Sequence, residues 1–176
     1  MSELSNTVSS VGNYNNIPTS LTSNTSVVNI IDGLTLTKNA NKQNWSDGFL
    51  TYTITLDNQT DTTYESPIIT EVIDTSLVEF VNDRVSINGV SAISLEYSYN
   101  DANHTLTVNL EKVDPTSKSI VTLNVKKKYN DFFILKSRCK VNYNVSDELY
   151  SNYVVVISPI RTNSIKYDCG TSYWRS

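Results

Sequence analysis

Apolar and polar residues alternate with a period of two along most of the chain beyond residue 33. The clearest run is 49–57, in which Tyr52, Ile54 and Leu56 share one face and threonines fill most of the other. Alternation of this kind predicts a half-buried β-strand, because successive side chains of a strand point to opposite faces.

Comparable runs recur at roughly even spacing, with turn residues such as Asn88-Gly89 and Asn100–Asn103 between them. They occupy residues 34–37, 84–88, 95–99, 105–110, 121–125, 133–143 and 153–157. No helical periodicity persists beyond two turns. The sequence therefore predicts an all-β, immunoglobulin-like antiparallel β-sandwich of about eight or nine strands.

The first 33 residues differ from this pattern and predict an extended N-terminal arm. Residues 1–26 include sixteen Ser, Thr or Asn, a composition that cannot form a core of its own. The arm ends in an apolar segment at 27–31, comprising Val27, Val28, Ile30 and Ile31. We expect an arm over 1–33, a sandwich over 34–160 and a C-terminal strand or tail over 161–176.

Net charge argues against a nucleic-acid partner. The formal charge is −4, and the one dense basic run, Lys126 to Lys128, is typical of lysines that protect a sheet edge. The N-terminus has neither a basic opening nor the apolar run of a secretion signal, and no stretch is long enough for a membrane span. We expect synthesis without a recognisable signal peptide.

Residues 34–157 resemble the conserved Ig-like repeat domain of bacterial surface and spore-appendage proteins. The resemblance rests on Lys38 at a strand end, Gly48 in a turn, the Tyr52–Thr55 strand ending at Asn58, Asp74 before Leu77, Phe80-Val81 and Asn88-Gly89. It implies an Ig-like fold, a place on a bacterial cell or spore surface, and a role in stalks, pili or appendages.

The resemblance also implies a candidate cross-link. Many members of that family join a lysine to an asparagine on a later strand through an isopeptide bond, with a buried carboxylate as catalyst. Lys38 matches the lysine and Asp74 could supply the acid, but Ser137 occupies the position of the asparagine. A hydroxyl cannot form that amide, so the alternatives are a bond to Asn152, an ion pair with Asp74, or a Lys38 side chain that reaches solvent.

Catalytic and metal chemistry find little support in the sequence. The sole histidine, His104, lies beside the Asn-rich turn, and the Asp residues stand singly at strand ends. We expect no enzyme activity, no cofactor and no metal. Cys139 is expected to be a buried thiol, whereas Cys169 in the tail could bridge to Cys139 or to another chain.

Two functions remain. The favoured one is a structural subunit that assembles with other copies of itself into a fibre, by donating the 27–31 strand to a neighbour's open sheet edge. The alternative is an adhesin or carbohydrate-binding module that uses exposed aromatic residues. The candidates for that role are Trp45, Tyr64, Tyr97, Tyr99 and Trp174.

Overall fold

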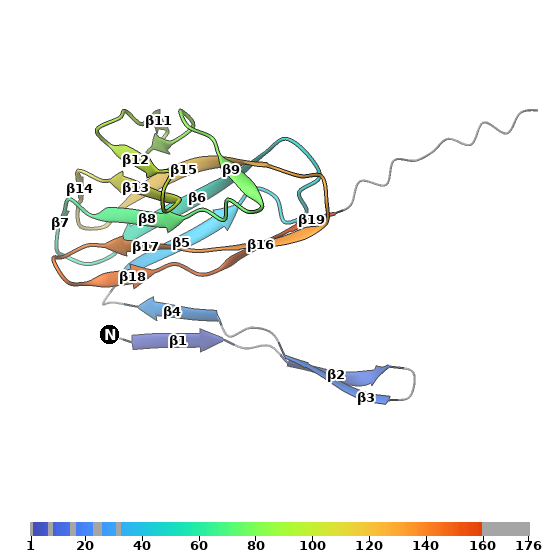
Figure 1. Cartoon of the computed structure of the whole chain (residues 1–176). Coiled ribbons are helices and arrows are strands. Elements are labelled where there is room, and N and C mark those ends of the chain that lie inside the picture. The colour runs from blue at the N-terminus through green and yellow to red at the C-terminus, as the bar shows by residue number, and fades with distance from the viewer. Residues whose placement is uncertain (1, 7–8, 15–16, 23–25, 31–32, 160–176) are drawn as a thin grey trace, which may run out of the picture.

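The structure is a computed structural model that describes residues 2–6, 9–14, 17–22, 26–30 and 33–159. Beyond residue 33 it contains two antiparallel sheets packed face to face (Figure 1). The predicted all-β sandwich is therefore confirmed.

The first sheet is built around two long central strands that pair over ten residues. Its strand order is β11 (Val90–Ser91), β10 (Ser86–Ile87), β15 (Ser117–Lys127), β6 (Phe49–Asn58) and β5 (Leu34–Ala40), with β9 (Val78–Phe80) also on β15. The Asn88-Gly89 pair, with φ of 51° and 82°, makes the tight turn between β10 and β11. Positive φ at both positions is what such a hairpin requires.

The second sheet contains β12 (Tyr97–Asn100), β13 (Thr105–Asn109), β8 (Ile68–Val72), β17 (Cys139–Asn142) and β18 (Glu148–Tyr150) in that order. Two short ladders extend the sandwich at its ends. One joins β7 (Tyr64–Glu65) to β14 (Lys112–Val113), and the other joins β16 (Phe133–Ser137) to β19 (Val154–Ser158). The chain of β16 continues directly into β17.

The core lies between the sheets and follows the alternation seen in the sequence. Leu50, Tyr52, Ile54 and Leu56 of β6 are all buried, and the threonines between them are half-buried. Burial of each large apolar side chain contributes about 1.5–3 kcal/mol, so these inward rows hold the sheets together.

The arm contains strands, of which only the segment 27–31 was expected from the sequence; its polar composition did not predict those over residues 2–22. β1 (Ser2–Asn6) pairs with β4 (Ser26–Ile30), and β2 (Ser9–Tyr14) pairs with β3 (Ile17–Thr22). Pairing satisfies main-chain hydrogen bonds without a core, which explains how a polar segment can form a ribbon. β4 precedes β5 and lies near β18 (Figure 1).

Candidate functional site

A buried ion pair links the two sheets. Lys38 on β5 and Glu71 on β8 have side chains that are 0% and 1% exposed, and the lysine Nζ donates a hydrogen bond to Glu71 Oε1. Lys38 Nζ also lies 2.6 Å from Ser137 Oγ on β16, and that hydroxyl donates to Glu71 Oε1 at 2.9 Å. Three strands are thus joined by one polar cluster.

Apolar and aromatic groups enclose this cluster. Lys38 Nζ lies 3.9 Å from the centroid of the Tyr52 ring, which adds a cation–π contact. Burial, and then the nearby Glu71 charge, raise the pKa of the Tyr52 hydroxyl. The same two causes raise the pKa of the Cys139 thiol to about 12. Both groups stay neutral at physiological pH.

The expected partner of Lys38 was wrong. Asp74 is exposed, and its carboxylate accepts hydrogen bonds from the main chain and hydroxyl of Ser76, as turn aspartates commonly do. The acid is Glu71, three residues earlier, because β8 ends at Val72 and Asp74 lies beyond it. The sequence held the signal: Ile69, Glu71 and Ile73 alternate, which puts Glu71 on the inward face.

Asn152 is placed near Lys38, but in a different role from the one considered. Its amide oxygen accepts from the main-chain N–H of Lys38 at 2.9 Å, and its amide nitrogen donates to the Lys38 carbonyl at 2.9 Å. The Asn152 side chain therefore completes the main-chain hydrogen bonds of the outer edge of β5. It binds the backbone of Lys38, whereas the amine is bound by Glu71 and Ser137.

The arrangement has an amine and a carboxylate but no amide between them. A nucleophilic amine needs a carbonyl carbon to attack, and Ser137 offers only a hydroxyl. Lys38, Glu71 and Ser137 therefore form a non-covalent pin between the sheets. Removing one charge of such a pair is strongly destabilising, because the other remains buried without its counter-charge.

The other sequence-predicted residues lie apart. His104 is exposed at its turn, and Cys139 is a buried free thiol, while Cys169 and Trp174 fall outside the described residues. Lys126 and Lys127 are on β15, which lies between β6 and β9, so the interpretation as edge protection was wrong. Lys126 instead pairs with Glu79 at 2.7 Å.

The predicted aromatic binding set does not form an exposed platform. Trp45 is fully buried, with its ring edge-on to Phe133. The remaining three described members pack within the domain: Tyr64 against Tyr143, Tyr97 with its hydroxyl on the Asp83 main chain, and Tyr99 against Phe80.

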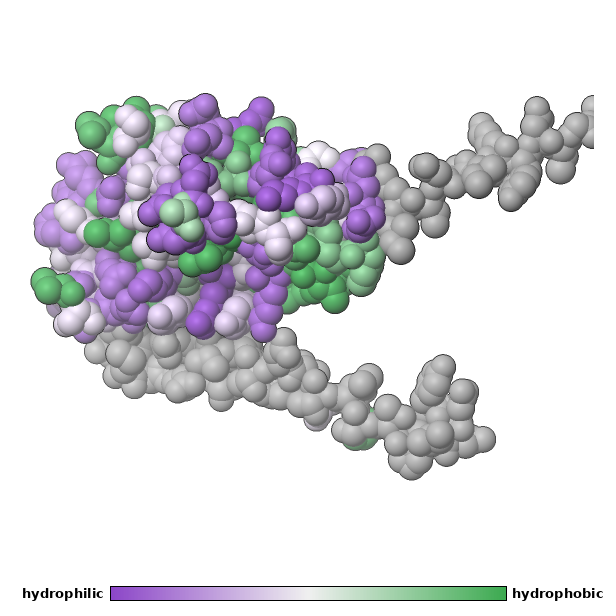
Figure 2. All heavy atoms as spheres, in the orientation of Figure 1, coloured by the Kyte–Doolittle hydropathy of each residue, from purple (hydrophilic) through white to green (hydrophobic). Residues whose placement is uncertain are grey.

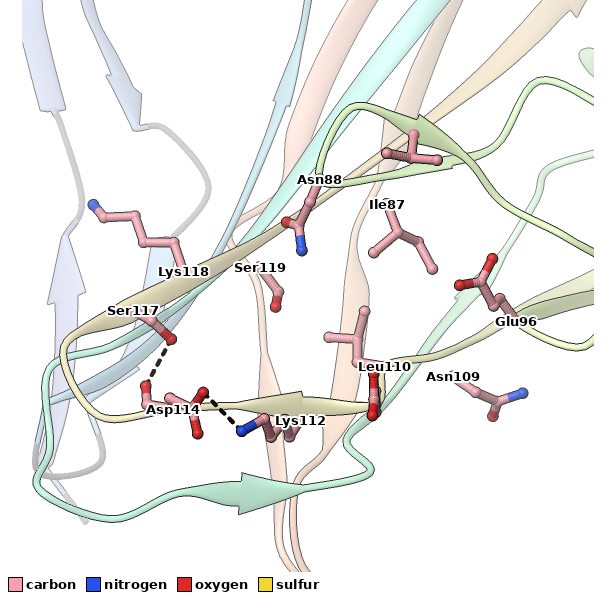
Figure 3. A pocket seen from close by; sticks show the side chains of 12 residues that line it. Ile87, Asn88, Glu96, Asn109, Leu110, Lys112, Asp114, Ser117, Lys118 and Ser119 are labelled. Carbon is pink, nitrogen blue, oxygen red and sulfur yellow. Dashed lines mark hydrogen bonds and ion pairs between the residues drawn. The ribbon is translucent and has the colours of Figure 1, made fainter.

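A cavity of ≈ 560 Å³ opens between β15, β14 and the β10–β11 turn (Figure 3). Several of its polar groups already have partners: Lys112 pairs with Asp114 at 3.1 Å, and Ser117 Oγ donates to the Asp114 carbonyl at 2.7 Å. Glu96 accepts from the main chain of Ile93. No residue of this lining is a histidine or cysteine.

An exposed apolar row covers the β16–β19 ladder. Ile134 is 55% exposed, and Ile157, directly opposite on β19, is 40% exposed. Phe132 and Val155 extend the row, and Figure 2 shows the hydrophobic surface gathered at this end of the sandwich. Within the described residues, β16 forms a ladder with β19 alone, so its other edge pairs with no strand.

The described residues contain no helix long and apolar enough to cross a membrane. They also bring together no group of three His, Cys, Asp or Glu side chains suited to a metal ion.

No protein-family model matches the chain, and no curated protein sequence matches it. Solved structures do. The major pilin subunit BcpA of Bacillus cereus is 15% identical with a TM-score of 0.55, over 88% of this chain and 48% of the pilin. The RrgA Jo.In complex is 11% identical with a TM-score of 0.56, over 83% of this chain and 97% of that one.

The C-terminal domain of the Streptococcus pyogenes antigen I/II-family protein AspA is also similar. It is 16% identical with a TM-score of 0.53, over 78% of this chain and 50% of that one. The chain spans about half the length of the B. cereus pilin. At these identities the comparisons establish the fold alone: an immunoglobulin-like sandwich similar to part of the B. cereus major pilin subunit.

Proposed function

We propose that the chain is a non-enzymatic structural subunit that assembles head to tail into a fibre on a bacterial cell or spore surface. The main observation in its favour is the β16–β19 ladder, which combines an unpaired strand edge with the exposed row of Ile134, Val155 and Ile157. Natural sheets normally protect such an edge, so an open apolar one indicates a surface that another chain covers.

The donor in this proposal is β4 with the residue that follows it. Val27, Val28 and Ile30 pair with Ser5, Leu4 and Ser2 of β1, and Ile31 lies outside the described residues. In the part of the chain that the structure describes, no ladder joins β4 to a sandwich strand. A neighbour's β16 edge could accept β4 once β4 leaves β1, because strand addition provides main-chain hydrogen bonds and apolar contacts together.

The fold supports a fibre subunit, since the similar structures include a major pilin subunit. The buried pin of Lys38 and Glu71 supports it as well. A subunit under tension benefits from contacts between its sheets, and this pin connects residues 33 positions apart on opposite sheets.

Deletion and surface variants test the proposal. Deletion of residues 1–31, or Ile134→Lys, should leave a folded monomer that forms no filaments in negative-stain electron microscopy. Val90→Lys is the matched control, because Val90 is 71% exposed on β11, away from the ladder, and its filaments should persist. Filaments that persist after deletion of residues 1–31 would rule out donation by β4.

A further inference from the structure

A groove of ≈ 580 Å³ on the outer face of the second sheet is lined by cationic and aromatic side chains. That volume lies within the range of about 300–1,000 Å³ typical of ligand sites. The cations come from the segment Lys136-Ser137-Arg138-Cys139-Lys140, whose alternate residues share a face. Three cations at every second position of a strand predict a charged row on one face, and this row was missing from the sequence-based predictions.

The guanidinium of Arg138 is held between two tyrosine rings. Its Cζ lies 4.6 Å from the Tyr150 ring centroid and 4.8 Å from that of Tyr153. Contacts over the rings use the faces of the guanidinium and leave its N–H edges available. Those edges match a carboxylate, which can accept two parallel hydrogen bonds.

Glu148 holds one wall of the groove in place. Its carboxylate accepts from the Tyr150 hydroxyl at 3.0 Å and pairs with Lys140. These bonds neutralise Lys140 and fix the Tyr150 ring against Arg138. The remaining cations, Lys136 and Arg138, are exposed and form no ion pair with any carboxylate of the described residues.

Lys136 and Arg138 also repel each other across one ring, because Lys136 Nζ lies 4.1 Å from the Tyr153 centroid. Two like charges gathered on a protein of net charge −4 favour an anion between them. The floor of the groove includes Thr70, whose hydroxyl is buried and has no hydrogen-bond partner among the described residues.

We propose that this groove binds an acidic polysaccharide. A uronate carboxylate is held by the Arg138 edge and by Lys136, and the sugar ring lies against Tyr153. Tyr153 is 41% exposed, so part of its ring is open to a sugar face. Apart from Lys136 and Ser137 on β16, the residues that line the groove lie outside the β16–β19 ladder of the proposed fibre contact.

A peptide ligand fits the groove less well. Extended peptides bind sheets mainly through main-chain hydrogen bonds to an open edge. At the groove floor, β8 is paired with both β13 and β17, and β17 with both β8 and β18. The groove therefore offers side chains but no free backbone to a peptide.

Titration calorimetry of the full chain with polygalacturonate tests the proposal, with neutral dextran and poly-glutamate as comparison polymers. We expect binding of polygalacturonate that weakens with added salt, and no binding of dextran. Arg138→Gln should weaken binding by about tenfold or more, and Tyr153→Ala should weaken it as well. Arg138→Lys should fall between wild type and Arg138→Gln, because it keeps the charge and loses the planar fork.

Lys126→Gln is the matched control, since Lys126 is an exposed strand lysine outside the groove. It should bind polygalacturonate like the wild type. An equal loss in Lys126→Gln and Arg138→Gln would mean diffuse charge attraction and would overturn the site. Failure to bind polygalacturonate, or equal binding of poly-glutamate, would overturn the assignment to an acidic polysaccharide.

Discussion

Cations inside the sandwich and on its outer face have opposite environments. Lys38 faces inward, is fully buried, and has both a carboxylate and a hydroxyl as partners. Lys136 and Arg138 face outward, lie on tyrosine rings and have no carboxylate partner among the described residues. Ser137, between them in sequence, points to the inner site. Burial forces a charge to be paired, whereas an exposed charge can remain available for a ligand.

The strongest test of the buried side is Lys38→Met. It leaves Glu71 buried without a counter-charge, and we expect a loss of about 3–5 kcal/mol in the free energy of unfolding, measured by urea denaturation. The double variant Lys38→Met/Glu71→Met should be more stable than the single one, because a hydrophobic pair removes the buried charge altogether. A Lys38→Met variant as stable as the wild type would show that the buried pair of Lys38 and Glu71 does not stabilise the fold.

A second test converts the pin into a covalent link. In Ser137→Asn, the Lys38 amine can attack the new side-chain carbonyl carbon, forming a C–N bond and releasing ammonia, with Glu71 relaying the proton. We expect intact-mass spectrometry to show the loss of one ammonia, and stability to rise by about 2–4 kcal/mol, as for other chain cross-links. Ser137→Asn/Glu71→Gln is the control, and it should keep its full mass. An unchanged mass in Ser137→Asn would show that the resemblance does not extend to this chemistry.

A smaller effect is expected at the edge of the buried site. Asn152→Ala removes both hydrogen bonds to the Lys38 main chain, and we expect a loss of about 1–2 kcal/mol in urea unfolding. Asn152→Asp keeps an acceptor for the Lys38 N–H but loses the donor, so its stability should lie between the two. Equal stability of Asn152→Ala and wild type would mean that water replaces the amide.

The smallest effect is expected for an exposed pair on the first sheet. Lys118 lies 2.7 Å from Asp57, and its hydrogen bond is the main reason that the pKa of the aspartate is lowered. Lys118→Ala should leave the urea midpoint at neutral pH unchanged, because exposed pairs contribute little. NMR titration should show the pKa of Asp57 rising towards its ordinary value. Because that pKa is depressed in the folded state, any stabilisation from the pair is present at neutral pH and lost on acidification.

The fold could be predicted from the sequence because alternation is a local property that core burial enforces strand by strand. Tyr52, Ile54 and Leu56 all face inward as expected. The identity of the acid could not be settled in the same way. Asp74 and Glu71 differ by three residues, and the choice depends on where β8 ends, which is set by its pairing with β13 and β17.

The cationic groove could not be predicted from the sequence, because it depends on contacts between segments that are distant along the chain. Lys136, Arg138 and Lys140 can be recognised as one row, but Tyr150 and Tyr153 approach them only after β18 pairs with β17. Trp45 illustrates the converse: it was considered as an exposed binding residue, and the structure buries it against Phe133.

The pairing of β4 with β1 has a kinetic consequence. In a fibre built by strand donation, each subunit must first give up this internal ladder, so joining a neighbour exchanges one set of main-chain hydrogen bonds for another. Such exchange begins slowly in a solution of monomers and speeds up once an existing fibre end is present. Added fragments of mature fibre should therefore shorten the lag before growth.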